Sequence, residues 1–196
     1  MAVKYSWLTI VAVLVVSAAT FAQGRKIDTT MKYTSAGYRV YCNNKSAEKN
    51  GLTISLIGFS NKSQRDANFE VKGRLKSAIV DDFNNDGFPD LLLCVYNGKD
   101  GNFGTVIGIA SENNESIKPV YFPDILDDTK LRVGYKGSDE FTMIEGTVMR
   151  TFPVYNVADT ANIKPTGMLR HIQYKMATTE GGVYKFKVLR TYETKL

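Results

Sequence analysis

The segment from Asp81 to Gly104 constrains the fold most strongly, because it joins an acidic turn, an apolar run and a glycine-rich loop in the sequence DDFNNDGFPDLLLCVYNGKDGNFG. The continuous apolar run Leu91 to Val95 predicts a strand that is covered on both faces. The loop that follows, Asn97 to Gly104, carries three glycines and one large aromatic, Phe103, where the tip of a loop is usually polar. This loop is therefore the first candidate for a binding surface.

Strand-like segments separated by turn residues recur roughly every eight to twelve residues, which is typical of antiparallel sandwiches and barrels. Glu145-Gly146 and Glu180-Gly181-Gly182 read as hairpin turns. The sequence predicts a single all-β domain over residues 23–196, mainly an antiparallel sandwich or barrel, with at most one or two short helices. The expected strands are 38–42, 52–59, 68–72, 75–80, 91–95, 105–110, 117–122, 141–144, 147–152, 169–176 and 183–192, with a loose leader at 23–30, a short helix at 123–130 and a polar loop at 156–167.

The first residues have the pattern of a secretory signal peptide. Lys4 gives a basic start, Trp7 to Val16 is almost wholly apolar, and Ser17 to Ala22 supplies small residues for cleavage. We expect a signal peptide over residues 1–22, cleaved after Ala22, with Ala19 as the alternative. No later segment is apolar for the roughly 20 residues that a spanning helix needs, so the sequence predicts a periplasmic or secreted protein without a membrane anchor.

Composition and charge argue against several functions. The formal net charge is +5, and the Lys and Arg residues are scattered, so a mixed-charge surface is favoured over nucleic-acid binding. The chain has one histidine, His171, which leaves the usual catalytic triads and zinc sites without their partners. The acidic pairs Asp127-Asp128 and Asp139-Glu140 are candidates for a glycosidase pair, but adjacent acidic loop residues are usually solvated. A non-enzymatic protein is the favoured interpretation.

The two cysteines, Cys42 and Cys94, both lie in strand-like runs. In an oxidising compartment they could form one disulfide across the core, or they could be two small buried thiols that never meet. The sequence leaves both alternatives open.

The acidic turn carries oxygen-bearing side chains at Asp82, Asn84, Asp86 and Asp90, a spacing that suits a calcium ion. It is similar to the D-x-N-x-D-G-x-x-D turn of FG-GAP-type repeats, although one copy is present here. The alternative is a plain turn in which Asp82 and Asn84 bond backbone amides and Gly87 has a positive φ. On the calcium interpretation the protein would be a calcium-stabilised extracellular binding or adhesion module.

The chain also resembles the periplasmic inhibitors of lysozyme that are directed at invertebrate-type lysozymes. The resemblance rests on Asp82 to Asp90, on the apolar strand that follows, and on the loop Asp100-Gly101-Asn102-Phe103-Gly104. Further matches are Gly134-Tyr135, Gly137, Asp139-Glu140-Phe141, Arg150-x-Phe152-Pro153-x-Tyr155, Pro165-Thr166-Gly167 and Gln173-Tyr174-Lys175. Together these pieces cover roughly residues 69–192.

This resemblance implies a partner and a binding loop. In that family an S-G-x-Y-G loop enters the lysozyme cleft, so the corresponding residues here are Lys99, Asp100, Gly101, Asn102, Phe103 and Gly104. Asp100 stands where the family has serine and Phe103 where it has tyrosine, while Lys99 offers attraction to a carboxylate. Phe103 is expected either as an exposed anchor or as a ring tucked onto its own sheet. A lysozyme-like glycosidase is the expected partner, and a homodimer is left open.

Overall fold

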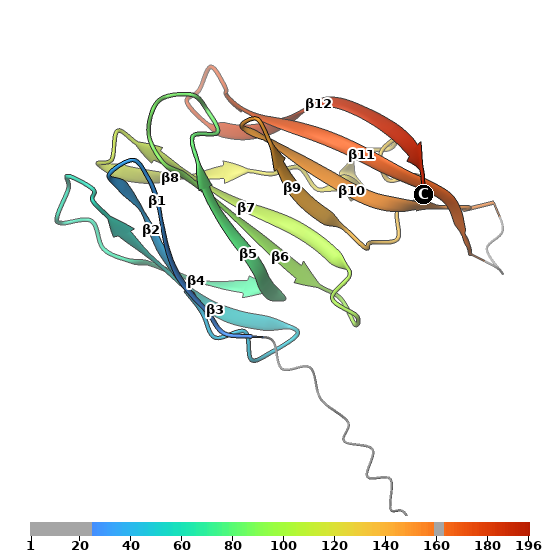
Figure 1. The fold of residues 1–196 in the computed structure, drawn as a ribbon, viewed down its shortest axis with the longest axis horizontal. Helices are drawn as coiled ribbons and strands as arrows, with labels where there is room; N and C mark the ends of the chain where they lie inside the picture. The colour runs from blue at the N-terminus through green and yellow to red at the C-terminus, as the bar shows by residue number, and fades with distance from the viewer. Residues whose placement is uncertain (1–24, 159–162) are drawn as a thin grey trace, which may run out of the picture.

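The computed structural model describes residues 25–158 and 163–196, and the regular secondary structure of this part of the chain is almost entirely β-strand (Figure 1). The strands are β1 Ile27–Tyr33, β2 Ala36–Cys42, β3 Lys49–Ile57, β4 Ala67–Lys72, β5 Arg74–Asp81, β6 Asp90–Asn97, β7 Phe103–Glu112, β8 Ser116–Tyr121, β9 Glu140–Ile144, β10 Thr147–Tyr155, β11 Pro165–Thr178 and β12 Tyr184–Lys195. One 3₁₀ helix, η1 Ile125–Asp127, interrupts them. The predicted all-β fold is confirmed.

The strands form two sheets. The small sheet has the order β1-β2-β3-β4, and the large sheet has the order β5-β6-β7-β8-β12-β11-β10-β9. Neighbouring strands are antiparallel except at the β8–β12 junction, where two residue pairs, Tyr184 with Val120 and Lys185 with Tyr121, join parallel strands. In Figure 1 the small sheet, blue to teal, lies against β5 and β6, while β9 to β12 curl away as the second half of the large sheet.

Strand β6 lies between two hydrophobic cores, which explains its continuous apolar sequence. Successive side chains of a strand point to opposite faces, so Leu91, Leu93 and Val95 pack toward the small sheet, while Leu92 and Cys94 pack into the curl of the large sheet. All five are buried. The strand predicted to be covered on both faces is therefore confirmed.

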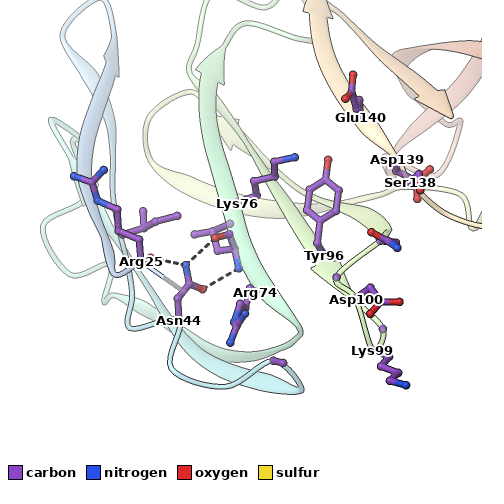
Figure 2. Close-up of a pocket in the computed structure, with 16 residues that line it drawn as sticks. Arg25, Asn44, Arg74, Lys76, Tyr96, Lys99, Asp100, Ser138, Asp139 and Glu140 are labelled. Atoms are coloured by element: carbon purple, nitrogen blue, oxygen red, sulfur yellow. Dashed lines mark hydrogen bonds between the residues drawn. The ribbon is translucent and has the colours of Figure 1, made fainter. Parts of the chain in front are cut away.

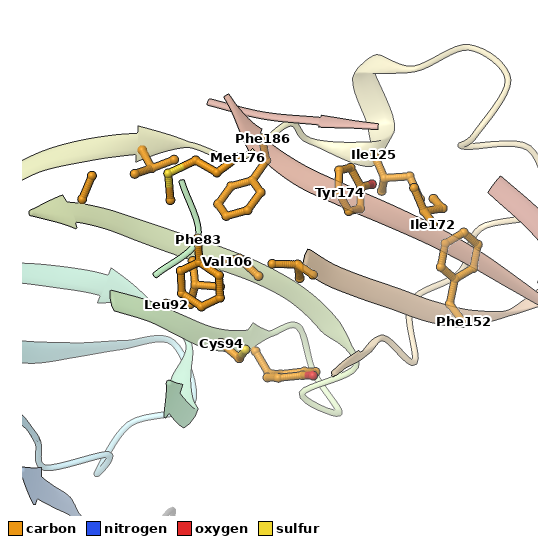
Figure 3. Packing of buried hydrophobic residues seen from close by; sticks show 14 of the residues in the cluster. Phe83, Leu92, Cys94, Val106, Ile125, Phe152, Ile172, Tyr174, Met176 and Phe186 are labelled. Carbon is orange, nitrogen blue, oxygen red and sulfur yellow. The ribbon is translucent and has the colours of Figure 1, made fainter. Parts of the chain in front are cut away.

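The first core, here called the small-sheet core, lies between the small sheet and β5 to β7. Its buried members are Ala36, Tyr38, Val40, Cys42, Leu52, Ile54, Phe59, Val71, Leu75, Leu91, Leu93, Val95 and Ile109. The second, the half-barrel core, joins both halves of the large sheet (Figure 3). Its buried members are Phe83, Leu92, Cys94, Tyr96, Val106, Ala110, Val120, Ile125, Tyr135, Val148, Phe152, Ile172, Tyr174, Met176 and Phe186.

The expected loose leader at residues 23–30 is wrong, because β1 begins at Ile27. This strand pairs with β2 over its whole length, from Ile27 with Cys42 to Tyr33 with Ala36. Its residues alternate between half-buried and exposed, so one face contributes to the small-sheet core without being strongly apolar. A half-buried edge strand of this kind has a weak sequence signal, since polar residues occupy every second position.

Two other segments differ in extent from their expected structure. The expected helix at 123–130 is only the 3₁₀ turn η1, in which the Asp124 carboxylate accepts a hydrogen bond from the Leu126 amide at 2.9 Å. The expected polar loop at 156–167 is shorter, because β11 already begins at Pro165. The hairpin turns at Glu145-Gly146 and Glu180 to Gly182 are present as predicted.

The predicted signal peptide, residues 1–22, lies outside the described residues. Within the described ranges no helix is long and apolar enough to cross a bilayer.

Cys42 and Cys94 are both buried and are not joined, so the disulfide alternative is wrong for this structure. The reason is the alternation of β6: Cys42 belongs to the small-sheet core, whereas Cys94 points into the half-barrel core on the other face of the strand. The Cys42 thiol donates to Asn44 Oδ1 at 3.2 Å. Burial raises the pKa of the Cys94 thiol, which lowers its reactivity.

We predict that a thiol reagent such as dithionitrobenzoate reacts with neither cysteine in the folded protein and with both after unfolding in denaturant without reductant. Both thiols are buried in the folded state, and no bond between them has to be reduced. The melting temperature should be the same with and without reductant. Fewer than two reactive thiols in the unfolded protein would contradict this arrangement.

Candidate functional site

The β6–β7 hairpin carries the loop expected to bind a partner. Its last strand pair is Asn97 with Phe103, so Gly98 to Asn102 forms the connection. Gly98 and Gly101 have positive φ angles of 87° and 64°, and the Gly101 amide donates to the Gly98 carbonyl at 3.1 Å. All five residues of the connection are exposed. The turn therefore presents Lys99 and Asp100 at its tip.

Phe103 lies at the base of this hairpin and not at its tip, because it is the first residue of β7. Its ring packs edge-on to Tyr135, with centroids 6.0 Å apart, and lies over Gly98, where an added Cβ would be 2.7 Å from Cδ2 of the phenylalanine. Even so, 42% of Phe103 is exposed. The structure thus combines the two expected alternatives: one side of the ring rests on its own hairpin and the other faces solvent.

A buried ion pair, here called the clamp, fixes the base of the hairpin. Arg150 Nε donates to Asp139 Oδ1 at 2.7 Å, and the two side chains are only 3% and 0% exposed. Asp139 Oδ2 accepts from the Gly104 amide at 2.7 Å, and Arg150 Nη2 donates to the Gly104 carbonyl at 3.2 Å. Both backbone groups of Gly104 are therefore bound by the clamp.

Tyr135 completes the clamp. Its hydroxyl donates to Asp139 Oδ2 at 2.5 Å and accepts from Arg150 Nη2 at 2.8 Å. Burial raises the pKa of the Tyr135 phenol, so the hydroxyl keeps the proton that it donates. Burial alone would lower the pKa of Arg150, but the hydrogen bond and charge of Asp139 outweigh it and raise that pKa. Both carboxylate oxygens of Asp139 and two of the guanidinium nitrogens of Arg150 are therefore hydrogen-bonded within the clamp.

The atoms around the clamp leave no room for a side chain at Gly104 or at Gly137. A Cβ at Gly104 would lie 2.6 Å from the Phe141 ring and 2.8 Å from Asp139 Cβ. Gly137 has a φ of 85°, and the segment after it places the Ser138 and Asp139 amides on the Asn102 carbonyl at 2.7 and 3.2 Å. The hairpin is thus held at Asn102 and at Gly104, immediately beside its exposed turn.

Two hollows border the hairpin. On one side a groove of about 790 Å³ runs between the hairpin, the start of β5 and the segment at Ser138 to Glu140 (Figure 2). A smaller hollow of about 290 Å³ lies beside Phe103. Its lining includes Pro123, Leu126, Tyr135 and Arg150.

The acidic turn between β5 and β6 is closed by its own side chains. Asp82 accepts from the Asp86 amide at 3.0 Å and from the Gly87 amide at 2.8 Å, and Asn84 Oδ1 accepts from the Asp86 amide at 3.1 Å. Asp86 accepts from the Phe88 amide at 2.8 Å. Gly87 has a φ of 86°. These are the bonds and the backbone conformation that the plain-turn interpretation predicts.

Asp90, the fourth candidate calcium ligand, is fully buried. Its carboxylate accepts from the Phe83 amide at 3.0 Å and from the Ser111 amide at 3.1 Å, which joins the turn to β7. Burial raises the pKa of Asp90 to about 7, although the two amide bonds act in the opposite direction. Within residues 25–158 and 163–196, no cluster of three or more carboxylate, histidine or cysteine side chains is arranged to hold a metal ion.

The chain was compared with models of known protein families, with curated proteins and with solved structures, and none of the three comparisons found a match. The function therefore has to be argued from the site itself.

The sequence located the hairpin and the acidic turn but missed the clamp and the groove. Gly134-Tyr135, Asp139 and Arg150 were part of the family resemblance, yet no local pattern shows that they meet at Gly104. Asp139, considered as half of a glycosidase pair, is instead buried in the clamp.

We predict that Arg150→Met lowers the free energy of unfolding by about 3–5 kcal/mol, because it leaves the Asp139 carboxylate buried without its counter-ion. Urea denaturation monitored by circular dichroism measures this change. Lys99→Met, also in the hairpin region but exposed, serves as the matched control and should leave stability within about 0.5 kcal/mol of the wild type. Equal stability of the Arg150 variant and the wild type would show that the clamp is not needed for folding.

We further predict that calcium leaves the melting temperature nearly unchanged, because the carboxylates of the turn are already bonded to backbone amides. The measurement compares thermal unfolding in millimolar calcium and in chelator. A rise of several degrees in calcium would mean that the ion binds the native state and that the turn rearranges to receive it.

Proposed function

We propose that this chain is a secreted, non-enzymatic protein that docks its β6–β7 hairpin, residues Lys99 to Gly104, into the cleft of a lysozyme-like glycosidase. The observation that supports this proposal is the contrast between an exposed turn and a buried, fully bonded base. Gly98 to Asn102 is exposed, while Gly104 is held on both backbone groups by the clamp.

A hairpin of this construction is suited to insertion because its base is already ordered. Binding costs free energy when flexible segments are fixed, and a loop fixed beforehand loses less. The clamp and the bonds to the Asn102 carbonyl fix the hairpin in the unbound protein. Much of the interaction energy can then come from a few anchor side chains.

Phe103 and Lys99 are the anchors that the geometry favours. The exposed side of Phe103 offers apolar surface at the base of the hairpin, where a rim of the cleft would contact it. Lys99 is exposed at the tip and forms no ion pair among the described residues. An acidic cleft would attract Lys99 and repel the neighbouring Asp100, so the two charges favour a deep position for the lysine.

We predict that Phe103→Ala weakens inhibition of a susceptible lysozyme, because it removes apolar contact area. Asp100→Ala should keep or strengthen inhibition, because it removes a charge of the same sign as the cleft. The measurement is an inhibition assay over a panel of lysozymes of different types. Lys32→Ala, on the exposed face of β1, is the control and should inhibit as the wild type does.

Two outcomes would contradict the proposal. If the wild-type protein inhibits a lysozyme, and Phe103→Ala and Asp100→Ala each inhibit it as well as the wild type does, the hairpin is not the binding element. If no lysozyme in the panel is inhibited or bound, the target class is wrong.

A further inference from the structure

The groove beside the hairpin has two chemically different sides. Arg74 and Lys76 of β5 line one side together with Arg25, and Asp100, Ser138 and Glu140 line the other (Figure 2). The groove thus spans the distance between β5 and β9, which are the first and last strands of the large sheet.

The basic side carries positive charge that nothing in the described part of the chain neutralises. Arg25, Arg74 and Lys76 line this side, and none of the three forms an ion pair among the described residues. The carboxylate of Asp139, which also lines the groove, is already paired with Arg150. The groove therefore attracts anions to the side formed by β5.

Arg74 is the residue best placed to bind an anion. Its Nε atom is buried and has no hydrogen-bond partner among the described residues. A buried donor without a partner is destabilising. A carboxylate or phosphate that bonded the guanidinium through two oxygens would provide the missing acceptor once the side chain turned toward it.

The backbone on this side of the groove is held by one buried side chain. Asn44 Nδ2 donates to the Arg25 carbonyl at 2.9 Å and to the Leu75 carbonyl at 2.8 Å, and Asn44 Oδ1 accepts from the Leu75 amide at 2.9 Å. Asn44 is 2% exposed. The backbone at Arg25 and at Leu75, the neighbour of Arg74, is thus fixed before any ligand arrives.

The other side offers groups that bond hydroxyls. Asn102, Ser138 and Glu140 are exposed there, and their side chains have no hydrogen-bond partner in the described ranges. The ring of Tyr96 lies between the two sides, with Lys76 Nζ 4.7 Å from its centroid. A ligand that suits both sides carries an acid group and several hydroxyls.

From this arrangement we propose that the groove binds an acidic saccharide, with its carboxylate on Arg74 and Lys76 and its hydroxyls on Asn102, Ser138 and Glu140. This site shares Asn102 with the docking hairpin, but its two main residues, Arg74 and Lys76, lie on β5. Binding here needs no lysozyme.

Calorimetric titration of the full-length mature protein with tetragalacturonate tests the site. The wild type should bind this acidic oligomer and should not bind the neutral oligomer maltotetraose. Arg74→Gln and Lys76→Gln should each weaken binding about tenfold, because each removes a charge-assisted hydrogen bond. Arg74→Lys should give a smaller loss, since it keeps the charge and loses the two-oxygen contact.

The matched control is Arg65→Gln, which removes one positive charge from an exposed residue that does not line the groove. It should bind tetragalacturonate as the wild type does, and melting curves show whether each variant is folded. An equal loss in the Arg65 variant would mean non-specific attraction and would overturn the proposal. So would absence of binding, or equal binding of maltotetraose.

Two further measurements distinguish a saccharide site from a simple anion site and from the docking hairpin. If inorganic phosphate binds as tightly as the oligomer and competes with it, the groove recognises a simple anion and the saccharide assignment is wrong. Phe103→Ala should retain saccharide binding whatever its effect on lysozyme inhibition, so failure of the hairpin proposal and failure of the groove proposal give different results.

Discussion

The buried pair of Asp139 and Arg150 is the interaction on which the arrangement of the site depends. Taking two charges out of water is costly, and a buried pair is stable only when its remaining donors and acceptors are bonded. Here Tyr135 and the backbone of Gly104 supply those bonds. The pair therefore stabilises one particular placement of the hairpin, because a shift of Gly104 would break two of the hydrogen bonds that stabilise the buried charges.

The parts of this structure that follow from sequence are those whose signals are local. The apolar run of β6, the turn at Glu145-Gly146 and the amide bonds of Asp82 each depend on residues within a short stretch of chain, and all three are present as expected. The position of Phe103 was harder to predict from the sequence, because the register of the hairpin decides whether a residue belongs to the turn or to the strand.

The remainder depends on contacts between distant segments. Arg150 reaches Gly104 across 46 positions of the sequence, and Asn44 reaches Leu75 across 31, so no periodicity or spacing could indicate either contact. Strand β1 was missed for a related reason, since its alternating residues gain their partner only when β2 lies beside them. The separation of Cys42 from Cys94 likewise required knowledge of which face of β6 each core occupies.

The curl of the large sheet is stabilised by side-chain packing more than by backbone hydrogen bonds between strands. Two residue pairs join β8 to β12, whereas the antiparallel neighbours on either side share many more. Backbone bonding therefore contributes little to the bend, and the aromatic side chains packed inside it, such as Phe122 against Phe186 and Tyr174, hold its two flanks at their spacing. Strands β5 and β9 are the two edge strands of the large sheet. Replacing one of these buried aromatic residues with a smaller residue would therefore change the separation between the two edge strands at the molecular surface.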